Sequence, residues 1–261
     1  MARTERLVAA TAGARPAGPG RRGDGTLPIP PGALHRVGRS PDDVAWASIL
    51  GLGLTQGADP SRFNYCDGLK RWMDVLFAAT LFLLLSPMLI AVAIAIRVDS
   101  PGPAVFRQRR VGRGGRPFTV YKFRTMTHVA SEGLVRFRAP DGRLVHKMAD
   151  DPRITPLGRI LRRTSIDELP QLLNVIRGDM SLVGPRPELA EIVGGYALWQ
   201  HRRHLVRPGL TGWWQVHARS ELQMHENTEL DLYYVDHLSF WLDVRILIET
   251  VHVVFFGYGA F

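Results

Sequence analysis

The apolar segment Val75–Ile96 restricts the fold of this chain more than any other stretch. Of its 22 residues, only Thr80, Ser86 and Pro87 are not apolar. A helix rises about 1.5 Å per residue, so this segment would be about 33 Å long, which is enough to cross the hydrocarbon core of a bilayer. The sequence therefore predicts a helix that is inserted in a membrane.

Two features of this segment leave its topology open. Ser86-Pro87 lies at its middle, and a proline inside a helix removes one hydrogen bond and kinks the helix. Both flanks are basic, and the positive-inside rule places basic flanks in the cytoplasm. A helix that enters, breaks at Ser86-Pro87 and returns would keep both flanks inside, but hydropathy alone favours a kinked span, because membrane helices tolerate proline. The basic flanking residues are Lys70, Arg71, Arg97, Arg107, Arg109, Arg110, Arg113, Arg116, Lys122 and Arg124.

The charge of the whole chain indicates an anionic partner. Its 261 residues include 33 Lys and Arg against 24 Asp and Glu, which gives a net charge of +9. Nucleic acid, an acidic membrane surface and a phosphorylated substrate would each suit this charge. Cys66 is the only cysteine, so the sequence excludes a disulfide framework and a thiolate metal site and fits a reducing, cytoplasmic-side location.

Composition predicts three parts along the chain. Residues 1–62 are rich in Arg, Gly, Pro and Ala and show no sustained period, so we expect a disordered or weakly structured extension. No apolar core follows its basic start, so it does not predict a secretory signal. Residues 63–97 form the membrane-inserted part, and residues 98–261 form a globular part in which residues 128–150 are expected to be an irregular polar loop.

The span Arg162–Pro187 concentrates residue types that suit phosphate chemistry. Ser165 and Glu168 match the S-x-x-E capping box, with Asp167 between them, so a helix is predicted to start here. Gly178 is the predicted end of that helix, because glycine readily adopts the left-handed conformation of a helix C-terminus.

This local pattern leaves two interpretations of the adjacent carboxylates open. In the first, Asp167 caps the helix and Glu168 is its capping-box partner. In the second, Asp167 is a nucleophile and Glu168 a metal ligand in a phosphate site, because the free amides of a helix start and the preceding Arg162 and Arg163 attract phosphate. The rest of the chain has to decide between them.

Residues Phe118–Met126 alternate in character and predict a short strand. Lys122 and Arg124 are two residues apart, so on a strand they would share one face about 6.6 Å apart, near the spacing of adjacent phosphates. The alternative is a solvated edge strand whose charges oppose aggregation. The glycines that precede it do not form a P-loop, because no G-K-[ST] follows them.

The C-terminal third predicts turns and helices. His201 and His204 are three residues apart, but no set of acids or cysteines completes a metal site around them, so we expect surface histidines. Arg207 leads into a turn rich in glycine, and a helix is predicted over Glu226–Asp236. A last apolar stripe predicts an amphipathic helix that lies in the membrane interface or on the core. The stripe consists of Phe240, Val244, Leu247, Val251 and Phe255.

The sequence lacks the motifs of several functional classes. It contains no recognisable nucleic-acid-binding motif, no signature of a serine hydrolase and no H-E-x-x-H. What remains is a membrane-inserted segment, basic residues suited to phosphates and two adjacent carboxylates. Together these features suit the transfer of a phosphorylated group to a lipid.

Six blocks of the chain, in this order, resemble the bacterial sugar transferases, which are monotopic phosphoglycosyl transferases that act on undecaprenyl phosphate. The resemblance runs from about Lys70 to Phe256 and does not cover the N-terminal extension. The blocks read KRWMDVLFAATLFLLLSPMLIAVAIAI, PGPAVFRQRRVG, FTVYKFRTM, DPRITPLGRILRRTSIDELPQLLNVIRGDMSLVGPRP, VRPGLTGWWQVHAR and ELDLYYVDHLSFWLDVRIL.

The resemblance implies a two-step transfer. Asp167 would attack the β-phosphate of a UDP-sugar, UMP would leave, and undecaprenyl phosphate would then attack the covalent aspartyl-phosphosugar. Glu168 would bind Mg²⁺, while Arg162 and Arg186 would contact phosphates. A carboxylate nucleophile must be ionised, so we expect the helix start and the arginines to lower the pKa of Asp167. Further basic residues in the family blocks near the site are Lys122, Arg124 and Arg207.

The resemblance also implies the fold and the location. We expect an α+β, mainly helical, monotopic membrane protein in which Ser86-Pro87 breaks a re-entrant helix, which reverses the interpretation from hydropathy. A small catalytic part with interfacial helices would lie on the cytoplasmic face of the bacterial inner membrane. The expected partners are a UDP-sugar, undecaprenyl phosphate and membrane lipid, with no nucleic acid, and homo-oligomerisation is left open. The reaction would be the first membrane step of exopolysaccharide, capsule, O-antigen or glycoprotein glycan assembly.

One loop departs from the family pattern, and one alternative function remains. The family usually reads G-W-A-Q-V-N-G-R where this chain has Gly212–Arg219, so Trp214, His217 and Ala218 prevent assignment of the sugar from this loop. The alternative is a membrane scaffold that binds anionic lipid through the basic residues beside the apolar segment. Such a protein would have no reason to keep adjacent carboxylates in a basic site.

Overall fold

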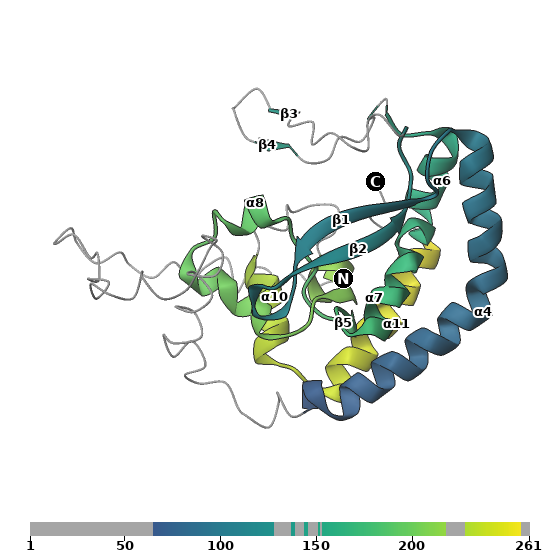
Figure 1. Ribbon diagram of the computed structural model, residues 1–261. Coiled ribbons are helices and arrows are strands. Elements are labelled where there is room, and N and C mark those ends of the chain that lie inside the picture. The colour runs from purple at the N-terminus through teal and green to yellow at the C-terminus, as the bar shows by residue number, and fades with distance from the viewer. Residues whose placement is uncertain are drawn as a thin grey trace. The chain divides into compact units, whose positions relative to one another are not determined.

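In the computed structural model of the protein, the described residues are 65–127, 137–138, 144–145, 151, 153–217 and 228–256. All of them belong to one compact unit, Arg39–Phe261. The predictions for the extension 1–62 and for most of the loop 128–150 lie outside the described residues. The elements in chain order are α4 (Leu69–Asp99), β1 (Val105–Val111), η2 (Arg113–Gly115), β2 (Pro117–Phe123), β3 (Phe137–Arg138), β4 (Leu144–Val145), α6 (Pro156–Arg163), η3 (Ile166–Gln171), α7 (Leu172–Arg177), β5 (Ser181–Val183), α8 (Ala190–Val193), η4 (Leu198–Leu205), β6 (Gly209–Thr211), α9 (Trp213–His217), α10 (Thr228–Asp236) and α11 (Phe240–Phe256), where η marks a 3₁₀ helix (Figure 1).

The described part of the chain is mainly helical with a small amount of sheet, which confirms the predicted α+β class. Strands β1 and β2 form an antiparallel hairpin, and its register pairs Phe106 with Lys122. Strands β3 and β4 are also antiparallel, whereas β5 and β6 are parallel and pair Val183 with Thr211. The observed strand β2 covers only part of the predicted strand Phe118–Met126, because β2 ends at Phe123.

Helix α4 contains the whole apolar segment, and it is the one helix in the described residues that is long and apolar enough to cross a membrane. Most of its large side chains are exposed, including Leu83 and Leu84 at 75% and 73%. Pro87 lies inside the helix, and the Ser86 Oγ donates to the Leu83 carbonyl at 2.7 Å. Figure 1 shows α4 changing direction part-way along its length. The helix bends but remains one element.

Both ends of α4 are fastened to the rest of the unit. Near the N-terminal end, the Arg71 guanidinium donates to the Val175 and Ile176 carbonyls at 2.6 and 2.9 Å, at the end of α7. At the C-terminal end, the Arg124 guanidinium donates to the Ser100 carbonyl at 2.6 Å and to the Ile96 carbonyl at 3.2 Å. Between these ends, α4 contacts α7, η3, α6 and β5 along one side.

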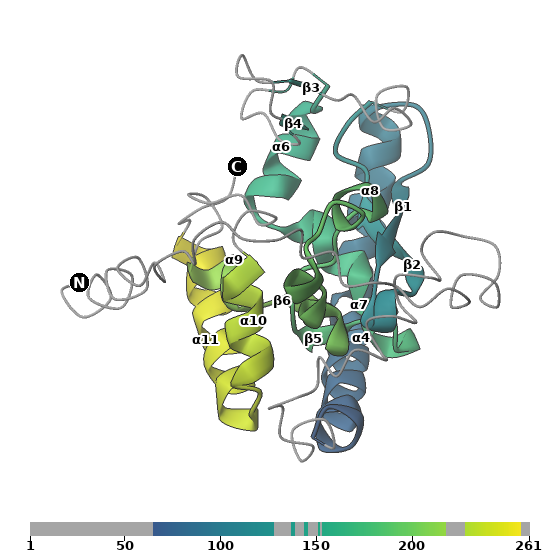
Figure 2. The same ribbon diagram turned by 90° about the vertical axis from the view of Figure 1, so that its left-hand side faces the viewer.

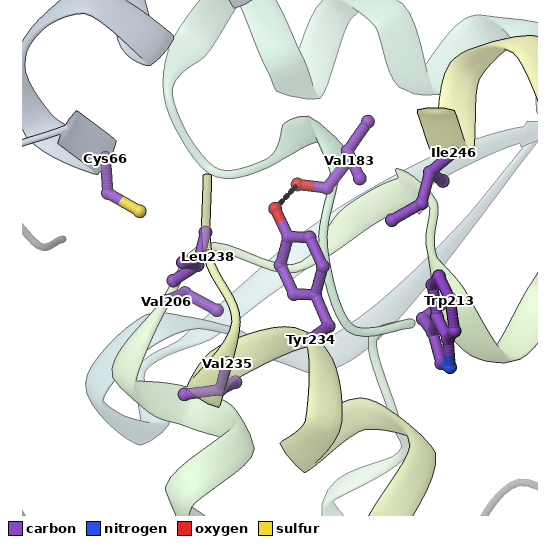
Figure 3. Packing of buried hydrophobic residues seen from close by; sticks show 8 residues of the cluster. All are labelled: Cys66, Val183, Val206, Trp213, Tyr234, Val235, Leu238 and Ile246. Carbon is purple, nitrogen blue, oxygen red and sulfur yellow. Dashed lines mark hydrogen bonds between the residues drawn. The ribbon is translucent and has the colours of Figure 1, made fainter. Parts of the chain in front are cut away.

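Three clusters of buried apolar residues form the core. In the first, Tyr234 of α10 lies among side chains from β5, α9 and α11, and its hydroxyl donates to the Val183 carbonyl at 3.0 Å (Figure 3). The second joins Ala78 of α4 to β2 and α7, and the third joins Leu89 and Ile96 of α4 to β2 and α6. Helix α9 contacts both α10 and α11 (Figure 2). The core thus connects the membrane-type helix to the elements that carry the predicted site.

The last helix, α11, turns a different face to the core than its apolar stripe suggests. Asp243 and Ile246 are buried, whereas Leu247 and Val251 of the predicted stripe are 36% and 57% exposed. Trp241 and Ile248 are more exposed than these two residues, at 76% and 65%. The exposure of Val251 therefore shows that the stripe does not pack on the core along its whole length.

Candidate active site

The adjacent carboxylates lie on η3, a six-residue 3₁₀ helix that runs directly into α7. Gly178 ends α7 with a φ of 98°, as predicted from its freedom to adopt the left-handed conformation. The predicted capping box is wrong, because Ser165 has a φ of 58° and its side chain makes no capping hydrogen bond. N-cap residues normally adopt an extended conformation. The backbone N–H of Glu168 is instead bonded to the Ser165 carbonyl at 3.1 Å.

Two cations from different elements hold the Glu168 carboxylate. The Lys122 ammonium on β2 donates to Oε1 at 2.8 Å. The Arg186 guanidinium, in the turn after β5, donates to Oε1 at 2.5 Å and to Oε2 at 3.2 Å. Burial raises the pKa of Glu168, but the charges and hydrogen bonds of Arg186 and Lys122 outweigh burial and hold this pKa well below its usual range. Glu168 is therefore an ionised, fixed carboxylate.

The neighbouring Asp167 is in a different state. No hydrogen bond engages its carboxylate within the part of the chain that the structure describes. Burial, together with the negative charge of Glu168, raises the pKa of Asp167 to about 6, although Lys122, Arg162 and Arg186 oppose this rise. The prediction of a lowered pKa is wrong, because it counted the arginines and omitted both burial and the second carboxylate.

Arg162 lies beside Asp167 as predicted. It belongs to the last turn of α6, and its Nε donates to the Thr125 hydroxyl at 2.9 Å. Burial lowers the pKa of Arg162, and the negative charge of Asp167 opposes that effect. A single hydrogen bond from Nε leaves most of the donor capacity of this guanidinium for a phosphate.

Two other predicted basic residues are engaged elsewhere. Arg124 is only 3% exposed and binds the carbonyls at the end of α4, because β2 has ended before it and the two-residue alternation with Lys122 no longer holds. Arg207 donates to the Gly178 carbonyl at 3.2 Å and to Asp67 at 3.0 Å. The contacts of these two side chains serve the architecture, so the structure does not bring them to the carboxylates.

Whether Glu168 can bind Mg²⁺, as predicted, depends on the groups around it. The described residues contain no group of three or more His, Cys, Asp or Glu side chains that could hold a metal ion. Glu168 already accepts from two cations, and a bare Mg²⁺ would be repelled by them. Mg²⁺ is commonly bound by one or two carboxylates together with substrate phosphates and waters. The residues therefore fit Mg²⁺ that arrives with a diphosphate.

Near the site, one prediction from the sequence is wrong and one contact was not predicted. His201 and His204 are 8% and 6% exposed, so the prediction of surface histidines is wrong. Between them, Arg203 binds the Arg186 carbonyl at 2.6 Å and pairs with Asp231 at 2.6 Å. No signal in the sequence links Arg203 to the Gly-Pro-Arg-Pro turn, because only the tertiary fold brings η4 to it.

The loop that departs from the family pattern is built around stacked rings. The rings of Trp213 and His217 stack at 3.8 Å, and the Arg245 guanidinium lies 5.5 Å from the centre of the Trp213 ring. Trp214 is buried, at 4% exposed. Ala218 lies outside the described residues, so its effect stays a prediction.

Comparison with known proteins gives consistent matches. The family described as bacterial sugar transferase matches residues 65–257. A UDP-N-acetylgalactosamine-undecaprenyl-phosphate N-acetylgalactosaminephosphotransferase of Aeromonas hydrophila is 41% identical over 198 residues, which cover 74% of this chain and 45% of that protein. A UDP-glucose:undecaprenyl-phosphate glucose-1-phosphate transferase of Caulobacter vibrioides is 44% identical over 227 residues, covering 84% of this chain and 81% of that protein.

A third relative, an uncharacterised sugar transferase of Bacillus subtilis, is 44% identical over 191 residues, which cover 73% of this chain and 89% of that protein. The chain therefore spans less than half of the Aeromonas relative but most of the other two.

Proposed function

Because the chain belongs to the bacterial sugar transferase family, we propose that it transfers a sugar 1-phosphate from a UDP-sugar to undecaprenyl phosphate and releases UMP. The observation that carries this proposal is the pair on η3, in which Glu168 is fixed by two cations and the half-buried Asp167 beside it has no hydrogen bond among the described residues. The names of the relatives differ in the sugar, so the proposal stops at the class of UDP-sugars.

The first proposed step is an attack by Asp167. Its Oδ forms a bond to the β-phosphorus of the UDP-sugar, and the bond from that phosphorus to the oxygen bridging the two phosphates breaks, so UMP leaves with the electron pair. A carboxyl with a pKa of about 6 is mostly ionised at neutral pH, so the attacking form is available. The product is an aspartyl-phosphosugar.

The second proposed step regenerates the enzyme. A phosphate oxygen of undecaprenyl phosphate attacks the same phosphorus, and the bond to Asp167 breaks. The carboxylate is restored and the lipid leaves as a diphosphate-linked sugar. No net proton transfer is required, which agrees with the absence of a histidine from the described contacts of Asp167.

The basic residues have separate roles in this proposal. Arg162 faces Asp167 and would neutralise charge that develops on the transferred phosphate. Lys122 and Arg186 keep Glu168 in place and reduce the repulsion between the two carboxylates and an incoming diphosphate. Glu168 and the substrate phosphates would hold Mg²⁺, which when bound would neutralise phosphate charge.

We propose a re-entrant insertion of α4 in the cytoplasmic face of the bacterial inner membrane. The support is that Lys70 and Asp74 near one end and Ile96 near the other are buried against the same unit. If α4 crossed the bilayer, these contacts would require the catalytic part on both sides. A cysteine in residues 1–62 and one in the catalytic part should label from the same side. Labelling from opposite sides would show that α4 spans.

The activity is tested with membranes that contain the full chain and a panel of UDP-sugars. UMP should appear from at least one UDP-sugar, and only when undecaprenyl phosphate and Mg²⁺ are both present. This reaction would be the first membrane step of polysaccharide or glycan assembly. Absence of UMP release across the panel, with a correctly folded protein, would contradict the proposed function.

A further inference from the structure

The Gly184–Pro187 turn, which carries Arg186, is held by donors from outside it. Pro185 and Pro187 have no N–H, so the turn has few donors with which to fix itself. Three successive carbonyls instead accept hydrogen bonds from three other parts of the chain. The Pro185 carbonyl accepts from the Gly209 N–H at 2.8 Å. The Arg186 carbonyl accepts from Arg203 Nη2 at 2.6 Å, and the Pro187 carbonyl accepts from Arg110 Nη1 at 3.2 Å.

Arg203 is the more deeply buried of the two arginine donors. It is 2% exposed, and its Nη2 also lies 2.6 Å from the Asp231 carboxylate on α10. Its Nη1 donates to the Tyr196 hydroxyl at 2.6 Å. The guanidinium is a planar group with donors in fixed directions, so partners on two sides define its orientation as well as its position. The Arg186 carbonyl is therefore held by a group that cannot easily rotate.

A buried ion pair is not needed for stability alone. Apolar residues of similar volume often replace such a pair with little or no loss of stability. The Arg203–Asp231 pair has in addition a contact that an apolar pair could not make, the hydrogen bond to the backbone of Arg186. The side chain of Arg186 binds both oxygens of Glu168, which requires a defined direction.

We propose that the buried Arg203–Asp231 pair is a positioning group for the transfer site. It holds the Arg186 carbonyl, thereby fixes the direction of the Arg186 side chain, and through Arg186 fixes Glu168. This inference rests on the proposed function, because it assigns the pair to the same reaction. Neither residue touches the reacting atoms.

The test removes the pair while keeping its volume. In the full chain, the double change Arg203→Met with Asp231→Leu leaves no unpaired buried charge, so we expect it to fold. Turnover should fall by roughly 10- to 100-fold, the range seen when groups that orient a site are lost. Tyr196→Phe is the matched control, since it removes one neutral hydrogen bond of Arg203 but leaves both the pair with Asp231 and the bond to Arg186, so its turnover should fall far less than that of the double variant, by about twofold at most.

A second background separates positioning from a general structural effect. In an Arg186→Ala protein, the double change should reduce the residual turnover by less than about twofold, because its effect passes through Arg186. The same fold-loss in both backgrounds, or unchanged turnover of the double variant, would overturn the inference. If the double variant does not fold, Arg203→Lys replaces it, since an ammonium keeps the charge beside Asp231 but lacks the planar group whose fixed donors orient the bond to the Arg186 carbonyl.

Failure of the proposed function is distinguishable from failure of this inference. A wild-type chain that releases no UMP from any UDP-sugar would contradict the function. Hydrogen exchange of the peptide covering residues 183–189 would then decide on the positioning. Faster exchange there in the Arg203 variant, with no change in Tyr196→Phe, would support the inference. Equal exchange in all three proteins would overturn it.

Discussion

Two polar clusters in this molecule, one mostly buried and one half-buried, use the same chemistry for different purposes. One, the anchor cluster, joins the start of α4 to α11 and β5. The other, the site cluster, joins η3 to β2 and the turn after β5. The anchor cluster consists of Tyr65, Lys70, Asp74, Ser181, Tyr234 and Asp243, and the site cluster consists of Lys122, Asp167, Glu168 and Arg186.

In the anchor cluster, every carboxylate oxygen has a partner. Asp243 Oδ2 accepts from Lys70 at 2.7 Å and from the Tyr65 hydroxyl at 2.8 Å, while its Oδ1 accepts from Tyr234 at 2.7 Å. Asp74 accepts from the Ser181 hydroxyl at 2.6 Å and from the backbone N–H of Leu182 at 3.2 Å. Carboxylates engaged in this way are committed to holding α4 on the unit.

In the site cluster, only one of the two carboxylates is engaged. Glu168 accepts from both of its cations, whereas Asp167 is left without a hydrogen bond among the described residues and has a raised pKa of about 6. Leaving a half-buried carboxylate in that state costs stability. The difference between the clusters supports our proposal that Asp167 reacts and that Glu168 organises the site around it.

The largest expected effect is on Asp167→Asn. The amide cannot act as the nucleophile, so turnover should fall by about a thousandfold or more. The thermal midpoint in detergent should stay the same or rise, because no hydrogen bond to the carboxylate is lost and its repulsion by Glu168 is removed. UMP release and thermal melting measure the two quantities. Retained turnover would show that Asp167 is not the nucleophile and that its role is structural, like that of Asp74 and Asp243.

Asp243→Asn should show the opposite pattern. It removes the close partner of the buried Lys70 and leaves only Asp74 at 3.9 Å, and breaking such a buried pair costs about 3–5 kcal/mol. We expect a large fall in thermal midpoint and in yield, while turnover per folded molecule is preserved. Glu249→Gln on the same helix is the control, since its exposed pair with Arg245 contributes about 0.5 kcal/mol at most. A normal midpoint for Asp243→Asn would break the comparison.

Lys122→Met and Arg124→Met compare two nearby residues for which the sequence predicted the same phosphate role. Lys122→Met should reduce turnover by roughly 10- to 100-fold, because Glu168 loses one of its two cations. Arg124→Met should instead lower stability by about 1–3 kcal/mol through the lost bonds at the end of α4. The kcat and KM of both proteins, measured below their melting temperatures, check this. A specific rise in the KM of Arg124→Met would restore its predicted phosphate role.

The smallest effect concerns His204. Burial, followed by the charge of Arg203 and the proximity of His201, holds the pKa of His204 well below its usual range. As the pH falls through about 6.5, the unfolded chain binds a proton that the folded chain cannot, so stability decreases towards acid. His204→Gln should flatten that decrease without changing turnover at neutral pH. Melting curves between pH 5 and pH 8, at about half-unit intervals, would reveal it; identical slopes would contradict it.

The sequence predicted correctly those features that depend only on neighbouring residues. The membrane-type helix follows from an apolar run, and the end of α7 follows from Gly178, whose left-handed conformation needs no distant partner. Arg162 and Arg186 lie near the carboxylates, and the phosphate contacts that the resemblance implies for them stay a prediction. The mainly helical class also follows from these elements.

The remaining features depend on contacts between distant segments. The S-x-x-E pattern at Ser165 is present, but Lys122 and Arg186 compete for Glu168 and the capping box does not form. Arg124 is drawn to the end of α4, which lies next to it only in the folded chain. The raised pKa of Asp167 arises from burial, which no residue pattern near it records.

The central claim is that Asp167 is the nucleophile, and the most direct measurement is the intact mass of the purified protein after incubation with a UDP-sugar and Mg²⁺ without the lipid acceptor. The account predicts a mass increase equal to one sugar phosphate, located on the peptide that contains Asp167, which disappears when undecaprenyl phosphate is added. The Asp167→Asn protein should show no increase. Turnover without any such adduct under rapid quenching, or an adduct on another residue, would contradict the account.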